Sequence, residues 1–182
     1  MFNFRNFNYK FVIVIIVLVL FIFLGGKYLF QQYRVNQPLE NQLLEYDKVK
    51  NVELIDNNNK TDVKIELKKS VNIYNAYQEI ENISQNHLED DFGKIILLDD
   101  RNSRLEEIYY ELHYTLFEGI VTSRYTRMKT QFDEIIEKKG IEDYELRVDN
   151  ENIYLKLVDN DNYLLKVISG NNSEKSGGET DG

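Results

Sequence analysis

The chain has no cysteine, no tryptophan, one proline and one alanine among its 182 residues. Without cysteine there are no disulfides, so any folded domain must be held together by its hydrophobic core. The same absence excludes attachment of a lipoprotein lipid and any zinc site built on thiolates. The single alanine, Ala76, is far from the N-terminus. The small-residue cleavage site of a secretory signal peptide is therefore poorly matched.

The longest apolar run covers residues 11–26 (FVIVIIVLVLFIFLGG), which contain no charged or hydrogen-bonding side chain and lie between Lys10 and Lys27. A helix of this length rises roughly 24 Å, short of a hydrocarbon core of about 30 Å. Both lysines can snorkel, and residues 28–30 extend the apolar stretch into the interface. The sequence predicts a single-pass anchor within residues 9–30, with residues 1–30 as cytoplasmic tail and anchor. A cleaved secretory signal is the alternative.

Acidic residues dominate the rest of the chain. Three of the 22 basic residues precede residue 31 and all 31 acidic residues follow it, so the distal part carries a formal charge of −12. Such a domain repels nucleic acid and anionic lipid headgroups. The short basic N-terminus favours a cytoplasmic N-terminus with the domain outside the cell membrane. The abundance of Asn, Ile, Lys and Tyr resembles the composition encoded by AT-rich bacterial genomes.

Three segments follow the predicted anchor. Residues 31–50 contain Pro38, which interrupts any helix leaving the membrane, so they predict a stalk or a short docking helix. Residues 51–168 are predicted to form the extracytoplasmic domain, with a sub-boundary near residue 100 as an option. Residues 169–182 are rich in Gly and Ser and are predicted to be a disordered tail.

Hydrophobic periodicity within residues 51–168 predicts the order β-β-α-β-α-α-β-β-β, an α+β fold. The first choice is one mostly antiparallel sheet with helices on one face, and the alternative is two small α/β modules breaking near residue 100. The continuous apolar run Lys94–Leu98 predicts a central strand covered on both faces. Gly119 and Thr122-Ser123 predict a break or kink in the helix that begins near Ser103.

No residue pattern predicts a catalytic, cofactor or metal site. His113 shares a helix side with Glu106 and could form an acid–base pair, but a histidine at the edge of the core explains it more simply. Residues 159–162 begin like a calcium loop, yet Tyr163 and Leu164 stand where the loop pattern needs Asp or Asn and then Gly. The acidic pairs at 90–91 and 99–100 are interpreted as loop and helix-cap residues rather than a cation site.

Tyrosine is the remaining feature, since one predicted helix carries Tyr110 and Tyr114 outside the stripe expected to face the core. With Phe117 they form a candidate protein interface, although tyrosines can also fill half-buried positions in a protein without tryptophan. The sequence therefore predicts a non-enzymatic, membrane-anchored accessory or assembly subunit of the bacterial cell envelope that binds another envelope protein or itself. A tethered sensor for peptide or glycan is the second hypothesis, and an anchored hydrolase is the third.

Overall fold

The computed structural model describes residues 12–22, 37–58, 60–141 and 143–170. Residues 12–22 form a helix whose large apolar side chains are exposed. In the parts of the chain that the structure describes, no helix is long and apolar enough to cross a membrane. The other residues of the predicted anchor, and residues 171–182 of the predicted tail, lie outside the described residues.

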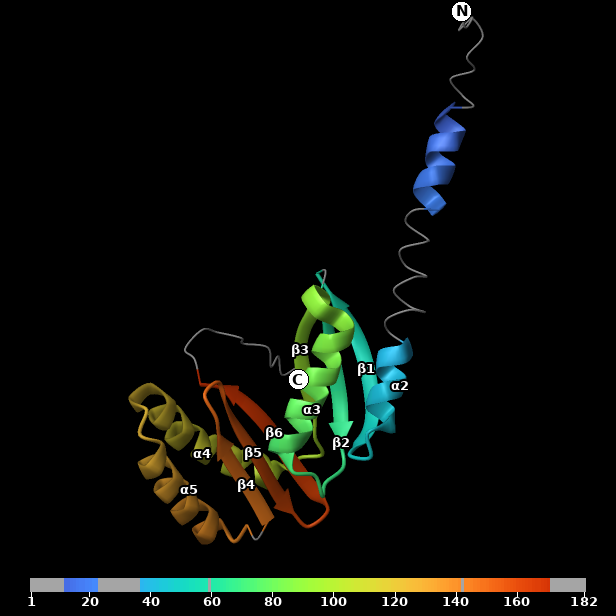
Figure 1. Ribbon diagram of the computed structural model, residues 1–182. Helices are drawn as coiled ribbons and strands as arrows, with labels where there is room; N and C mark the ends of the chain where they lie inside the picture. Colours follow the sequence, from blue (N-terminus) through green and yellow to red (C-terminus); the bar gives the residue numbers. More distant parts are fainter. Residues whose placement is uncertain (1–11, 23–36, 59, 142, 171–182) are drawn as a thin grey trace, which may run out of the picture.

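The first half of the folded body is a three-stranded sheet with helices on one face (Figure 1). Its elements are α2 (Gln37–Glu45), β1 (Val49–Asn57), β2 (Lys60–Leu67), α3 (Ile73–Leu88), the 3-10 turn η2 (Glu89–Asp91) and β3 (Phe92–Leu98). On β2 the apolar residues Val63, Ile65 and Leu67 are buried against the helices. Lys64 lies on the other face, 3.0 Å from Glu53 of β1. The hairpin therefore has one polar face, as the alternation predicts.

The second half is also a three-stranded sheet (Figure 1). Its elements are α4 (Ser103–Thr122), α5 (Tyr125–Lys139), β4 (Asp143–Val148), β5 (Asn152–Asp159) and β6 (Asn162–Ser169). Helices α4 and α5 cover one face, where Ile153, Leu155 and Leu157 of β5 are buried among their apolar side chains. Tyr154 and Leu165 of the other face belong to the core of the first half.

The α+β class and the order of elements agree with the sequence analysis, but the expectation of one sheet is wrong. The strands form two sheets, β1-β2-β3 and β4-β5-β6. Strand β3 runs parallel to β2 and ends its sheet, so Lys94–Leu98 is not a central strand. All seven residues of β3 are half-buried, whereas β5 has six buried residues. The strand covered on both faces is therefore β5.

Side chains join the two halves. The Tyr163 hydroxyl donates to the Leu67 carbonyl oxygen at 2.9 Å, and Lys156 Nζ donates to the Val71 carbonyl oxygen at 3.3 Å. Glu145 accepts from the Ile73 backbone N–H at 3.1 Å, which places a carboxylate at the N-terminus of α3. The sub-boundary near residue 100 therefore separates two sheets that share a core.

Helix α2, which lies within residues 31–50, packs into the core of the first half. Leu39 and Leu43 are fully buried in the core that α3 and the first sheet share. Pro38 is the second residue of α2, a first-turn position where the missing N–H removes no helical hydrogen bond.

Helix α4 runs unbroken through Gly119, and the expected break occurs at Thr122-Ser123. It ends at Thr122, and Ser123 follows in the left-handed conformation (φ 54°). A Cβ atom on Gly119 would lie 2.4 Å from Met128 Sδ and 2.8 Å from Met128 Cβ. Gly119 therefore lets α5 approach α4 closely.

We expect Gly119→Ala to destabilise the protein, although alanine favours helix by roughly 1 kcal/mol over glycine. The added methyl group overpacks the contact with Met128, which costs about 1–3 kcal/mol. Urea unfolding measures the change, and the Gly119→Ala step should cost less in a Met128→Ala background, where the contacts with Met128 Sδ and Cγ are absent. A stabilised single variant would contradict the close approach.

Candidate protein-binding face

One side of α4 carries large apolar side chains that face solvent. The side facing α5 and the second sheet buries Leu105, Ile108, Leu112 and Leu116. Tyr110, Tyr114 and Phe117 lie outside this stripe and are 66%, 63% and 42% exposed. Val121, which the sequence analysis did not single out, extends the row and is 66% exposed. We call these four residues the aromatic face.

Two side chains of the aromatic face contact each other. The Tyr110 and Tyr114 rings meet edge to face with centroids 5.6 Å apart, and the Tyr114 hydroxyl donates to the Tyr110 hydroxyl oxygen at 3.0 Å. That hydrogen bond raises the pKa of Tyr114. The spacing 110, 114, 117, 121 repeats every four, three and four residues, which could have identified Val121 from the sequence. Pairing of this kind holds both rings in a defined arrangement without burying them.

His113 lies behind the aromatic face and is half-buried. Its ring centroid is 4.3 Å from that of Phe117 and 6.0 Å from that of Tyr109. These ring contacts agree with a histidine at the edge of the core. The other histidine, His87, has Nε2 2.6 Å from Gln42 Oε1, so it links α3 to α2. The two histidines therefore lie in different structural contexts, and no group of ligating side chains that could hold a metal occurs among the described residues.

The acidic clusters lie in turns and between strands, and the expectation that the pair at 99–100 caps a helix is wrong, because Asn102 caps α4. Asp159–Asn162 joins β5 to β6, with Asn160 in the left-handed conformation (φ 53°). Asp99 accepts two hydrogen bonds from Arg101 at 2.7 Å and one from the Leu165 backbone N–H at 2.9 Å. These bonds occupy both oxygens of Asp99, so the pair at 99–100 holds β3 against β6.

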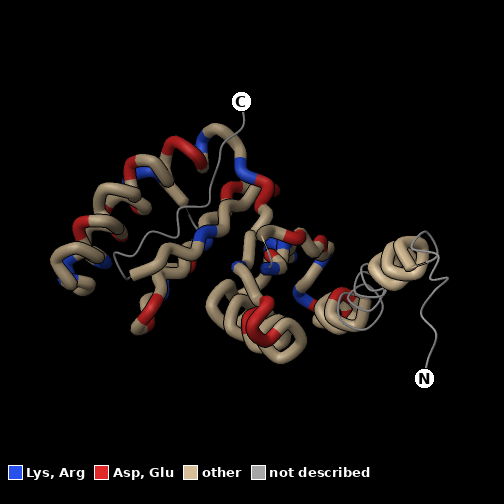
Figure 2. The backbone as a smooth tube through the Cα atoms, turned by 90° about the horizontal axis from the view of Figure 1, so that it is seen from above, with Lys and Arg blue, Asp and Glu red and all other residues tan. Residues whose placement is uncertain are grey.

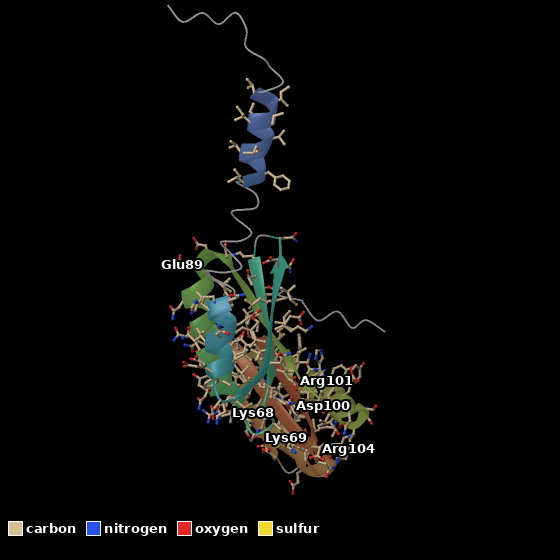
Figure 3. The ribbon with its side chains drawn as sticks, turned by 90° about the vertical axis from the view of Figure 1, so that its right-hand side faces the viewer. Lys68, Lys69, Glu89, Asp100, Arg101 and Arg104 are labelled. Carbon is tan, nitrogen blue, oxygen red and sulfur yellow. The ribbon has the colours of Figure 1, made fainter. Side chains whose placement is uncertain are left out.

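Basic residues are interspersed with acidic residues over the folded body (Figure 2). One basic cluster, Lys68, Lys69, Arg101 and Arg104, lies toward the end of the body opposite Glu89 (Figure 3). Lys69 donates to the Asn160 carbonyl oxygen at 2.8 Å, and Arg104 forms an ion pair with Asp159. Because Arg101 is bound by Asp99, most of this positive charge is neutralised within the fold.

The two carboxyl groups with shifted pKa values, Glu111 and Asp149, do not favour a general acid. A hydrogen bond from Lys139 lowers the pKa of Glu111. Burial tends to raise the pKa of Asp149, but hydrogen bonds from the backbone N–H groups of Glu151 and Asn152 and from the Tyr154 hydroxyl lower it. A general acid working near neutral pH needs a raised carboxyl pKa, which is the opposite direction.

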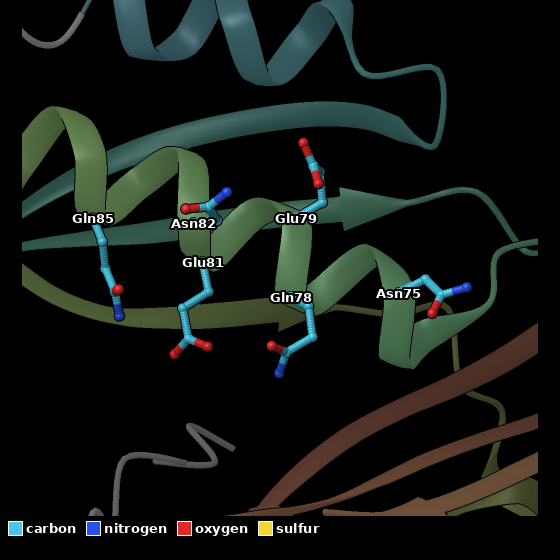
Figure 4. Close-up of a pocket in the computed structure, with 6 residues that line it drawn as sticks. All are labelled: Asn75, Gln78, Glu79, Glu81, Asn82 and Gln85. Carbon is cyan, nitrogen blue, oxygen red and sulfur yellow. The ribbon is translucent and has the colours of Figure 1, made fainter.

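A polar depression lies along α3 (Figure 4). Its lining consists of four carboxamides and two carboxylates, namely Asn75, Gln78, Glu79, Glu81, Asn82 and Gln85. All six belong to the same helix, and most are exposed. Gln78 Nε2 donates to the Tyr154 hydroxyl oxygen at 2.9 Å, so one carboxamide is tied to the second sheet. The depression is a helix surface rather than an enclosed cavity.

Neither a scan against protein-family models nor searches of curated proteins and of solved structures gave a match to this chain.

Proposed function

We propose that this chain is a non-enzymatic, membrane-anchored domain that binds another protein through the aromatic face of α4. Its role is that of an assembly or accessory subunit in a bacterial cell envelope. The N-terminus is cytoplasmic and the domain lies outside the cell membrane. The partner is another envelope protein or a second copy of the chain.

The exposure of the aromatic face carries this proposal. Tyr110, Tyr114, Phe117 and Val121 are contiguous on one helix, and the core of the second half is complete without them. Tyrosine and phenylalanine are enriched at protein interfaces because they supply large contact areas at a low cost in side-chain entropy. Single exposed apolar residues need no explanation, but a contiguous row of them indicates an interaction site.

The anchor is proposed from residues 11–26 and their flanking lysines. The described part of this segment, residues 12–22, is helical, uncharged and exposes its apolar side chains. An exposed helix of this composition is favoured in lipid and disfavoured in water.

A tethered module for a peptide or glycan is the second candidate function. The depression on α3 favours it, since carboxamides both donate and accept hydrogen bonds, as sugar hydroxyls and peptide groups require. The aromatic face favours protein binding, and we rank protein binding first because tight glycan binding usually needs a more enclosed site.

We expect the double substitution Tyr110→Ser and Tyr114→Ser to abolish partner capture or self-association while leaving the fold intact. Both side chains are more than 60% exposed, so Tm should change by no more than about 2 °C. Crosslinking in intact membranes followed by co-purification measures capture.

Leu44→Ser with Val148→Ser is the matched control, because these side chains are 48% and 37% exposed at separate sites. The control should retain capture. A large fall in Tm for the tyrosine variant would place the tyrosines in the core, and unchanged capture would overturn the proposed interface.

A further inference from the structure

Strands β3 and β6 diverge from a common point and leave a groove between the two sheets. They are joined where the Tyr163 backbone N–H donates to the Asp100 carbonyl oxygen at 3.0 Å, an antiparallel bridge. Beside it, Asp99 accepts from the Leu165 N–H. Beyond these contacts a groove of about 220 Å³ opens between residues 94–97 of β3 and residues 165–169 of β6. This volume is below the roughly 300–1,000 Å³ of typical small-molecule pockets.

Each wall of the groove is an edge strand, β3 or β6. Its outward backbone N–H and C=O groups form no hydrogen bond within its own sheet. The N–H groups of Tyr163 and Leu165 point out of the second sheet, so the alternation of a strand turns the N–H of Val167 outward as well. On β3, the Lys94 N–H donates to Asp62 of β2 at 3.1 Å. The same alternation turns the backbone groups of Ile95 and Leu97 away from β2 and toward β6. The groove is therefore bounded by two open sheet edges.

The two sides of the groove differ in chemistry. Tyr77, Ile95, Leu97, Leu165 and Val167 belong to the apolar core of the first half and form an apolar floor. Lys94, Ile96 and Lys166 also line the groove but do not belong to that core.

The two groove lysines are half-buried, and neither forms an ion pair within the described part of the chain. Lys166 Nζ lies over the Tyr109 ring, 5.7 Å from its centroid, a contact that leaves its charge without an anionic partner. In a domain with a large excess of acidic residues, two lysines without ion pairs in one groove favour an anionic ligand.

We propose that the groove binds an extended segment of a partner protein in which apolar and acidic residues alternate. Period-two alternation then places the apolar side chains on the floor and the carboxylates near Lys94 and Lys166. The added strand hydrogen-bonds to Ile95 and Leu97 on one side and to Val167 on the other. Because β3 and β6 are antiparallel at their bridge, it runs parallel to one and antiparallel to the other.

The groove shares no lining residue with the aromatic face. Residues 171–182 follow β6 directly, but they contain no large apolar side chain and do not match the floor.

The test uses the full-length protein in mild detergent and a fluorescent peptide of alternating valine and glutamate. Binding should saturate and weaken with added salt, and an alternating valine–lysine peptide should not bind. The double substitution Lys94→Glu and Lys166→Glu should weaken binding at least about tenfold. Lys138→Glu on the exposed end of α5 is the matched control and should leave binding unchanged.

Backbone amide exchange provides the second measurement. The amides of Ile95, Leu97 and Val167 should exchange readily in the free protein and become protected with the glutamate peptide. Val167→Pro removes one outward N–H without removing a bond to β5, so it should weaken binding while the fold persists.

Equal binding of both peptides, or protection confined to other elements, would overturn the inference. Because the aromatic-face variant keeps the groove intact, its loss of capture would not affect this result.

Discussion

We expect Leu157→Asp to eliminate the cooperative unfolding transition of the domain. Leu157 is fully buried on β5, between Tyr144 of β4 and Leu164 of β6, and belongs to the core beneath α4 and α5. A carboxylate at this position has no cationic partner among the core residues, and burying it unpaired costs several kcal/mol. Whole domains are stable by only about 5–15 kcal/mol. Circular dichroism during thermal unfolding should show no native baseline.

Ile96→Asp is the matched comparison, since it places the same charge on a half-buried residue of the edge strand β3. The substituted side chain stays near solvent and near Lys94, so the variant should fold with a Tm lowered by only a few degrees. If the Ile96 variant unfolds and the Leu157 variant does not, the assignment of β5 as the central strand is wrong.

The contrast between β3 and β5 shows why burial could not be predicted from apolar residues alone. Residues 95–98 are all apolar, yet the strand is at a sheet edge beside the groove. Strand β5 alternates apolar residues with Tyr154 and Lys156, which predicts one wet face. Tyr154 and Lys156 are nevertheless buried, because their polar atoms form hydrogen bonds. Lys156 Nζ donates to the Val71 carbonyl oxygen, and the Tyr154 hydroxyl bonds to three side chains. Val71 and Gln78 come from long-range packing, whereas Asn152 and Asp149 are close to Tyr154 in sequence.

Features with local causes were predictable. The turn at Asp159–Asn162, the left-handed Gly140 after α5 and the buried stripe of α4 all follow from residues close in sequence. Helix starts were less secure, because several capping residues compete. Asn102 rather than Ser103 caps α4, by accepting from the Leu105 N–H at 2.8 Å. The division into two sheets and the use of Gly119 as a helix contact depend on tertiary packing and have no local signal.

The exposed position of the candidate interface was also predictable in part. Helical spacing separates Tyr110 and Tyr114 from Leu105, Ile108 and Leu112, and the structure exposes both tyrosines. The groove between β3 and β6 had no such signal, because it exists only where the edges of two sheets meet.

Tyr154 is the residue whose removal should most weaken the junction between the two halves. Its ring is fully buried and meets the rings of Tyr74 and Tyr77 edge to face, at centroid distances of 5.1 and 5.6 Å. We expect Tyr154→Ala to lower the free energy of unfolding by about 3–5 kcal/mol, because a large cavity opens between α3 and β5. Urea unfolding measures the loss, and a change below about 1 kcal/mol would contradict the junction role.

Tyr154→Phe separates the hydroxyl from the ring. The hydroxyl accepts from Gln78 and Asn152 and donates to Asp149 at 2.8 Å. Its removal leaves these groups short of a partner, which should cost about 1–3 kcal/mol at neutral pH. Tyr77→Phe is the control, since the Tyr77 hydroxyl makes none of these bonds, and it should cost less.

The pH dependence of the stability lost in Tyr154→Phe tests whether the hydrogen bond to Asp149 is the cause. The pKa of Asp149 is lowered in the folded protein, so its ionised form stabilises the fold above the unfolded pKa of about 3.9. That stability disappears as the pH falls through the folded pKa, where Asp149 becomes protonated. The difference between wild type and Tyr154→Phe should therefore shrink on acidification. A difference that is constant from neutral to acidic pH would show that the bond to the carboxylate contributes nothing, and that Gln78 and Asn152 account for the whole effect.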